Sequence, residues 1–171
     1  AEAGAAIVVL AVYKDRACYT HLGDCRLYLH RNGVLAKLTE DDSYLQPMVQ
    51  AGLLTEAQAA VHPDGNLLVR CLGRGGIDTR PEVCSLEVQP GDTLLAASDG
   101  FWRSGLDVAC RALDGLAHTP VTSSILHSLL SQLVYGVVER GADDNVSAAL
   151  LHVPGPGPWV RKTWPLNHKE N

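Results

Sequence analysis

Basic residues are scarce in this sequence, and long apolar runs are absent. The chain has 14 Lys and Arg against 19 Asp and Glu, a formal net charge of -5. No stretch is dense in Lys or Arg, so the electrostatic pattern that nucleic-acid binding requires is missing. The longest apolar run, AAIVVLAVY, is far shorter than the ~20 residues that cross a bilayer. We therefore expect a soluble protein that binds neither nucleic acid nor membrane.

Paired cysteine motifs are also absent. The five cysteines include no CxxC pair and leave one thiol over in any disulfide scheme; they are Cys18, Cys25, Cys71, Cys84 and Cys110. The opening AEAG has no basic region of the kind that begins a signal peptide. We expect a cytoplasmic protein with reduced cysteines that mostly serve as small buried apolar side chains.

Several catalytic motifs are missing. The seven histidines form no HExxH and no paired spacing with cysteine, which disfavours a zinc site. No G-x-S-x-G elbow surrounds a serine, and the GRGG at 73–76 fits neither dinucleotide-binding nor P-loop spacing. Zinc hydrolases, serine hydrolases and nucleotide-binding folds are thus disfavoured.

What the sequence has is a series of short apolar segments with β-branched residues, separated by turns. At 171 residues, of which 46% are hydrophobic, one domain is expected. The first strands form a β-meander, with Asn32-Gly33 as a hairpin signal. The expected strands are 5–13, 16–22, 25–30, 34–38, 81–88, 92–98 and 145–153.

Helical periodicity appears in two places. Short helices are predicted within 43–54 and 55–65, joined through Gly52 and capped by Ser43 and Thr55, and TEAQ is a capping box. A longer helix over 121–140 ends before Gly141. Segment 66–73 fits a strand or a helix. Because the first strands have no helices between them, the fold class is α+β with antiparallel sheets. We expect one domain over 1–153 and a Pro-rich tail over 154–171.

Three acids stand where a buried strand meets a loop. Asp24 follows one strand through a glycine, Asp99 follows LLAAS directly, and Asp144 precedes the last strand. Each could simply be a turn residue, since Asp bonds its own backbone. Together, carboxylates at a sheet edge suit Mg²⁺ or Mn²⁺, which prefer oxygen ligands.

Five segments in order resemble the type 2C (PPM) metal-dependent serine/threonine protein phosphatases, especially the compact bacterial members. They are HLGDCRLYLHRNG, LTEDDS, AGLLTEAQAAVHPDGNLLVRCLG, VQPGDTLLAASDGFW and GADDNVSAALLHV. The resemblance runs from about Gly4 to Val153. It implies an αββα sandwich of antiparallel sheets flanked by helices, with a flap near the active site over about 43–68.

The resemblance also implies an activity. Asp99 and Asp144 would bind the metals of a two-metal Mn²⁺ or Mg²⁺ centre, with Gly100 adjacent, and Asp24 would belong to a third, weaker site. No catalytic residue beyond these ligands is implied: a water shared by the metals attacks phosphoserine or phosphothreonine. The implied partners are phosphoproteins, those of a cognate Ser/Thr kinase, in cytoplasmic signalling.

Some features depart from the family pattern. A phosphate-binding arginine, an acidic ligand and a DG-x-GG motif, all expected upstream of Ala5, do not occur in these residues. About the first third of a typical catalytic domain is thus absent, so the chain is a fragment, an incomplete chain, or a protein that has lost the segment. A non-catalytic pseudophosphatase is the alternative function. Cys25 replaces the usual serine, and we expect Asp24 to raise its thiol pKa. Asp42 stands where histidine is common.

Overall fold

The computed structural model describes residues 4–73, 80–118 and 120–155. The GRGG at 73–76 and the tail expected over 154–171 therefore fall largely outside the described residues. No helix in the described part of the chain combines the length and apolar character needed to cross a membrane.

Two antiparallel sheets lie face to face. The smaller has the order β1-β2-β5, formed by β1 (Ile7–Tyr13), β2 (Arg16–Leu22) and β5 (Cys84–Glu87). The larger has the order β4-β3-β6-β7. Its strands are β3 (Arg26–Arg31), β4 (Val34–Lys37), β6 (Thr93–Ala97) and β7 (Ala148–His152). The predicted strands are confirmed, but the single meander is wrong: β2 and β3 do not pair, and the chain changes sheets at residues 23–25.

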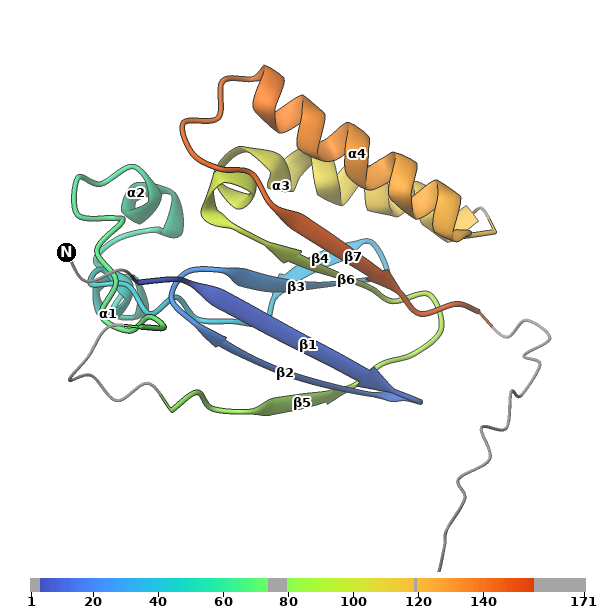
Figure 1. Cartoon of the computed structure of the whole chain (residues 1–171), viewed down its shortest axis with the longest axis horizontal. Helices are drawn as coiled ribbons and strands as arrows, with labels where there is room; N and C mark the ends of the chain where they lie inside the picture. Colours follow the sequence, from blue (N-terminus) through green and yellow to red (C-terminus); the bar gives the residue numbers. More distant parts are fainter. Residues whose placement is uncertain (1–3, 74–79, 119, 156–171) are drawn as a thin grey trace, which may run out of the picture.

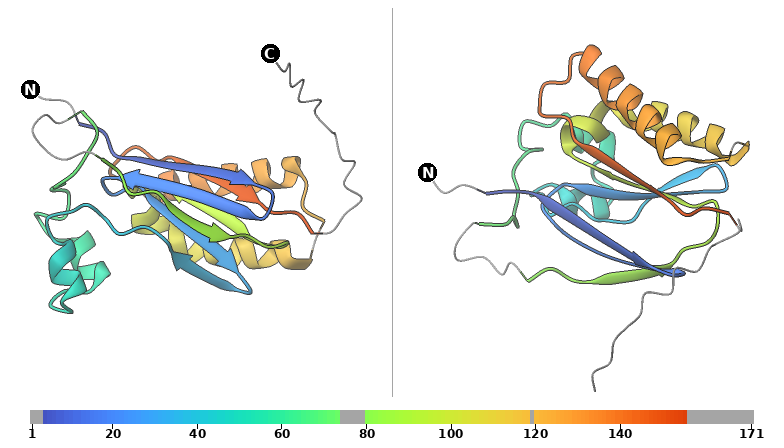
Figure 2. Two further views of the ribbon diagram at one scale, coloured as in Figure 1. Left: turned by 90° about the horizontal axis from the view of Figure 1, so that it is seen from below. Right: turned by 45° about the vertical axis from the view of Figure 1, so that its right-hand side comes forward.

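Helices cover the outer face of the larger sheet. They are α3 (Asp99–Asp114) and α4 (Ser123–Glu139), and a 3-10 turn (Gly115–His118) follows α3. Figure 1 shows both above β6 and β7, with β1, β2 and β5 on the other side, and Figure 2 shows the same layers from two further directions. Among the described residues no helix covers the outer face of the smaller sheet, where Val9 is 47% and Tyr13 75% exposed. The predicted sandwich of two antiparallel sheets with flanking helices is confirmed. In the described part of the chain, the helical layer covers the larger sheet only.

The alternation of side chains along β6 explains the layers. Leu94 belongs to the core between the two sheets, whereas Leu95 belongs to the core under the helices, and both are fully buried. A central strand with both faces buried favours an uninterrupted apolar run, here LLAA after Thr93. In the helical layer, Phe101 and Val137 pack with Leu95.

The flap contains α1 (Gln46–Gln50) and α2 (Glu56–Ala60), with Gly52 between them at a φ of 71°. Thr55 forms the predicted capping box. Ser43 does not cap α1, which follows Leu45; Ser43 instead forms an isolated bridge with Leu68. Segment 66–73 is neither strand nor helix but carries isolated bridges. Figure 1 places α1 and α2 at the end of the sandwich where α3 begins.

Candidate metal centre at one edge of the larger sheet

The strand pairing brings the three predicted acids to one edge of the larger sheet. β3 pairs with β6 through Arg26 and Ala97, and β6 pairs with β7 through Ala97 and Ala148. The start of β3, the end of β6 and the start of β7 therefore lie side by side. Asp24, Asp99 and Asp144 are each two to four residues beyond these ends.

The loop that carries Asp144 is fastened to the start of α3. The Ser98 N–H donates to the Ser147 carbonyl at 2.9 Å, and the Ser147 N–H donates to Ser98 Oγ at 3.0 Å. Ser98 Oγ also donates to the Asn145 carbonyl at 3.2 Å. A Cβ at Gly100 would lie only 2.6 Å from that carbonyl oxygen. Gly100, predicted as adjacent to the metal, thus permits the close approach of the Asp144 loop to Asp99.

The loop that carries Asp24 is fixed from two sides. Trp102 on α3 donates its indole N–H to the Asp24 carbonyl at 2.9 Å. The Gly23 N–H donates to the Asp42 carboxylate at 3.0 Å, and the Asp42 N–H donates back to the Gly23 carbonyl at 3.0 Å. Arg70 donates to the other Asp42 oxygen at 3.1 Å. Asp42, a departure from the family pattern, therefore holds the turn before Asp24.

Burial and neighbouring negative charges raise two pKa values at this edge. Burial, followed by the negative charge of Asp99, raises the pKa of Asp24 to about 6. Arg103 partly offsets this repulsion and lies with its Nε 3.7 Å from Asp99 Oδ2. Burial, then the charges of Asp24 and Asp99, also raises the pKa of the Cys25 thiol to about 11. The expected direction for Cys25 is confirmed, although burial is the larger cause.

The donor chemistry fits a hard divalent cation. Asp99 Oδ1 accepts the Gly100 N–H at 2.9 Å, and Asp144 Oδ1 accepts the Asn145 N–H at 2.6 Å, so both carboxylates are oriented by their own backbone. Within residues 4–73, 80–118 and 120–155, however, the three acids do not form a group with all ligand atoms within 4.8 Å of one another. They share an edge but do not form one compact ligand set.

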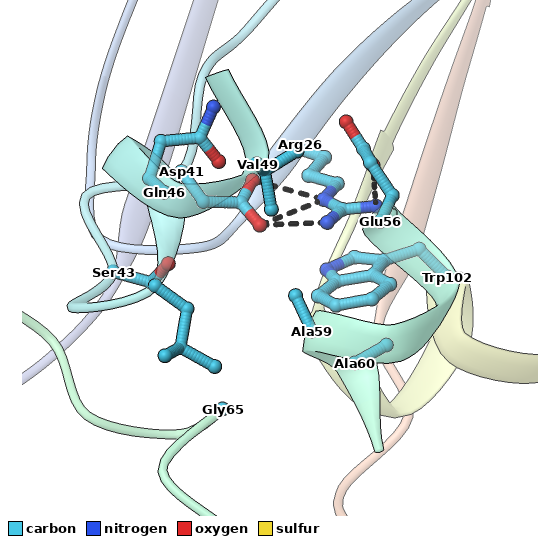
Figure 3. A pocket seen from close by; sticks show the side chains of 11 residues that line it. Arg26, Asp41, Ser43, Gln46, Val49, Glu56, Ala59, Ala60, Gly65 and Trp102 are labelled. Atoms are coloured by element: carbon cyan, nitrogen blue, oxygen red, sulfur yellow. Dashed lines mark hydrogen bonds and ion pairs between the residues drawn. The ribbon is translucent and has the colours of Figure 1, made fainter. Parts of the chain in front are cut away.

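Beside the acids, Arg26 joins the larger sheet to the flap (Figure 3). Its guanidinium donates to both Asp41 oxygens, at 2.6 Å from Nη2 and 2.9 Å from Nε. It also stacks on Trp102 at 3.4 Å from the ring centre and lies 3.2 Å from Glu56. The cavity at this point is about 20 Å³, which suits a water molecule but no substrate. The donors of Arg26 are therefore directed at protein carboxylates.

No sequence pattern pointed to Arg26, Trp102 or Arg103 as part of the site. Arg26 was visible only as the second residue after Asp24. Trp102 and Arg103 lie on α3, a helix that was not predicted at all. Its signal was present: Ser98 stands at the N-cap position and Phe101, Gly105, Ala109 and Leu113 recur with helical spacing. Arg103 also donates to the Ala60 carbonyl and to Asn66, so it links Asp99 to the flap.

Comparisons with known proteins show what this chain is similar to, although no family profile matches it. Protein phosphatase PhpP of Streptococcus pneumoniae is 31% identical over 151 residues, which are 86% of this chain and 57% of PhpP. The serine/threonine phosphatase of S. agalactiae superposes with a TM-score of 0.74 at 30% identity, covering 88% of this chain and 59% of that one.

A third relative is the catalytic domain of the phosphatase PstP, whose structure was solved in complex with two manganese ions. It superposes with a TM-score of 0.67 at 28% identity, covering 89% of this chain and 60% of the domain. The chain thus spans less than two thirds of these relatives.

In sequence and in fold, the chain is similar to the PPM serine/threonine protein phosphatases. Over most of its length this chain is a homologue of the bacterial type 2C enzymes, as the motifs indicated.

Proposed function

We propose that the protein containing this chain is an Mn²⁺- or Mg²⁺-dependent phosphatase of phosphoserine and phosphothreonine in proteins. The observation that carries the proposal is the fastening of the Asp144 loop onto Ser98 and Gly100, which holds two carboxylates at the start of α3. In this proposal Asp99 and Asp144 are ligands of the main centre, and Asp24 belongs to a third site.

The relatives support the choice of ion, since the PstP catalytic domain was solved with manganese. Bound cations of this kind neutralise phosphate charge and lower the pKa of a coordinated water. The residues of this chain orient the ligands: Ser98 holds the Asp144 loop, and Trp102 holds the Asp24 loop through its carbonyl. Arg103 lies beside Asp99 and binds the flap. It therefore links the position of the flap to the edge of the sheet that carries the acids.

Phosphoproteins modified by a Ser/Thr kinase are the proposed substrates, and cytoplasmic signalling is the proposed setting. The flap, about 43–68, is the proposed determinant of substrate choice. We also propose the domain assignment of 1–153, with 154–171 as a tail.

Activity measurements test the proposal. Residues 1–171 supply Asp99 and Asp144 but no DG-x-GG aspartate. Because positioned charges each account for ~10²-fold in rate and act as a unit, the 171-residue chain alone should hydrolyse p-nitrophenyl phosphate no faster than Mn²⁺ in buffer. A longer form that carries such motifs upstream should turn over a phosphothreonine peptide with Mn²⁺.

The matched variants are Asp99→Asn and Asp143→Asn in the longer form. Asp143 is the exposed neighbour of Asp144 and loses the same charge. Asp99→Asn should abolish Mn²⁺-dependent turnover, and Asp143→Asn should retain it. Turnover by both variants would contradict the ligand assignment. If a longer form binds a phosphopeptide but does not hydrolyse it, the result would favour the alternative function, a non-catalytic pseudophosphatase.

A further inference from the structure

A second cluster of potential metal ligands lies at the other end of α3. It consists of His30 on β3 with Cys110 and Asp114 on α3. The ligand atoms of the three side chains all lie within 4.8 Å of one another, and no other trio of His, Cys, Asp or Glu in the described part of the chain meets this condition.

Local structure holds these side chains together. Cys110 and Asp114 are four residues apart on one helix, so they lie on the same face, one turn from each other. His30 is 5% exposed, and its Nε2 lies 2.8 Å from Asp114 Oδ1. His30 and Asp114 would satisfy each other without a third group. The thiol of Cys110 lies beside this hydrogen-bonded pair. The three side chains together offer a metal ion one nitrogen, one sulfur and one oxygen ligand.

The donors select a different ion from the one proposed at the acidic edge. Mg²⁺ and Mn²⁺ prefer oxygen ligands, whereas Zn²⁺ binds imidazole nitrogen, thiolate and carboxylate in tetrahedral geometry. Sites with three protein ligands leave a fourth position for water. The neighbouring cleft, lined in part by His30, Asp114 and Leu116, has a volume of about 710 Å³ and gives solvent access.

The cluster is separate from the proposed catalytic edge. Cys110 is 11 residues beyond Asp99 on α3, which at 1.5 Å per residue is about 16 Å along the helix axis. His30 likewise lies toward the end of β3 that is remote from Arg26. An ion here would not share ligands with Asp24, Asp99 or Asp144.

We propose that His30, Cys110 and Asp114 bind one Zn²⁺ ion, with water as the fourth ligand. Binding takes neutral His30 through Nε2, whose proton passes through solvent to Nδ1, together with the Asp114 carboxylate, and the Cys110 thiol gives its proton to solvent as it becomes a thiolate. The His30–Asp114 hydrogen bond is replaced by two bonds to the ion. The ion joins the last turn of α3 to β3 and stabilises the folded state by mass action.

Cobalt titration of the reduced 171-residue chain tests the proposal. Co²⁺ stands in for Zn²⁺ and gives a thiolate-to-metal charge-transfer absorption, which a site made only of carboxylates does not give. The expected result is one equivalent of Co²⁺ with this absorption, displaced by one equivalent of Zn²⁺. Zinc should also raise the melting temperature.

Variants assign the thiolate. Cys110→Ala should remove the absorption. Asp114→Asn should weaken Zn²⁺ binding by about 100-fold, since even the loss of a residue that only hydrogen-bonds a metal ligand costs 10–100-fold. Asp107→Asn is the matched acid control because Asp107 is exposed on the same helix. Cys18→Ala, at an exposed cysteine, and Cys25→Ala, beside Asp24, are the thiol controls. All three controls should bind like the wild type.

The absence of a thiolate absorption in the wild-type chain would overturn the proposal without reference to any variant. An absorption that survives Cys110→Ala, or disappears with Cys18→Ala or Cys25→Ala, would also overturn it. Because the readout is a thiolate signal and not turnover, failure here leaves the phosphatase proposal intact, and loss of phosphatase activity leaves the zinc proposal intact.

Discussion

Replacing Gly100 with alanine would separate the two loops that carry Asp99 and Asp144. The added Cβ would lie 2.6 Å from the Asn145 carbonyl oxygen and 3.2 Å from the Asp144 carbonyl oxygen. Close carbon–oxygen contacts in proteins begin at about 3.3 Å, so one side must retreat by about 0.7 Å. Both obstructing atoms belong to the backbone, which cannot give way by a rotamer change. The Asp144 loop must therefore move.

Two energy terms oppose each other in Gly100→Ala. Overpacking costs typically about 1–3 kcal/mol. Alanine gains up to ~1 kcal/mol over glycine inside a helix. The net destabilisation should be about 1 kcal/mol. Metal affinity should suffer more, because a site tolerates only ~0.5 Å of misplacement, and we expect Mn²⁺ binding to weaken about tenfold or more.

Gly115→Ala is the matched control for this substitution. Gly115 lies at the other end of α3, and a Cβ there would meet no atom within 4 Å. It should leave Mn²⁺ affinity unchanged and raise stability by a few tenths to ~1 kcal/mol. Urea denaturation gives the stability and titration calorimetry gives the affinity. If Gly100→Ala matched Gly115→Ala in both, the close approach of the loops would not hold the site together.

Two further predictions concern charges outside the ligand edge. Arg26→Met leaves the buried Asp41 carboxylate without its cation and should lower the free energy of unfolding, measured by urea denaturation, by about 3–5 kcal/mol. Arg111→Met, at an exposed position, should lower it little. Equal losses in the two variants would contradict a stabilising role for the Arg26–Asp41 pair. Burial alone would raise the pKa of Asp92, but hydrogen bonds from Arg31 and the Gln89 N–H outweigh it and lower that pKa. The wild type should therefore exceed Asp92→Asn in stability most at neutral pH, and the difference should shrink as the pH falls below about 4, where Asp92 takes up a proton first in the unfolded state and, at lower pH, in the folded state. If the stability difference between the wild type and Asp92→Asn grew as the pH fell, the pKa of Asp92 would be raised in the folded state and the prediction would be wrong.

Much of the fold could be predicted from local pattern because strand alternation and turn residues are local properties. The β-meander was wrong because nothing local at residues 23–25 shows that β2 and β3 join different sheets. Helix α3 was missed because Gly100 and Gly105 lower its helix propensity. Both glycines serve packing: a Cβ at Gly105 would lie 2.9 Å from Val137 on α4. That requirement exists only in the folded structure.

The candidate site was predictable to a similar extent. Asp24, Asp99 and Asp144 stand out because each follows or precedes an apolar strand, and antiparallel pairing then places them at one edge. The residues that hold their loops depend on contacts between distant parts of the chain. Trp102 reaches Asp24 across 78 positions, which no spacing rule anticipates.

The most direct test of the central claim is Mn²⁺ titration calorimetry on a form of the protein that carries a DG-x-GG motif upstream, with single charge-neutral variants. Asp99→Asn and Asp144→Asn should each remove most of the measurable affinity, because each deletes a proposed ligand, while Asp143→Asn should bind like the wild type. Wild-type affinity in Asp99→Asn and Asp144→Asn, or an equal loss in all three variants, would contradict a metal centre at this edge of the sheet.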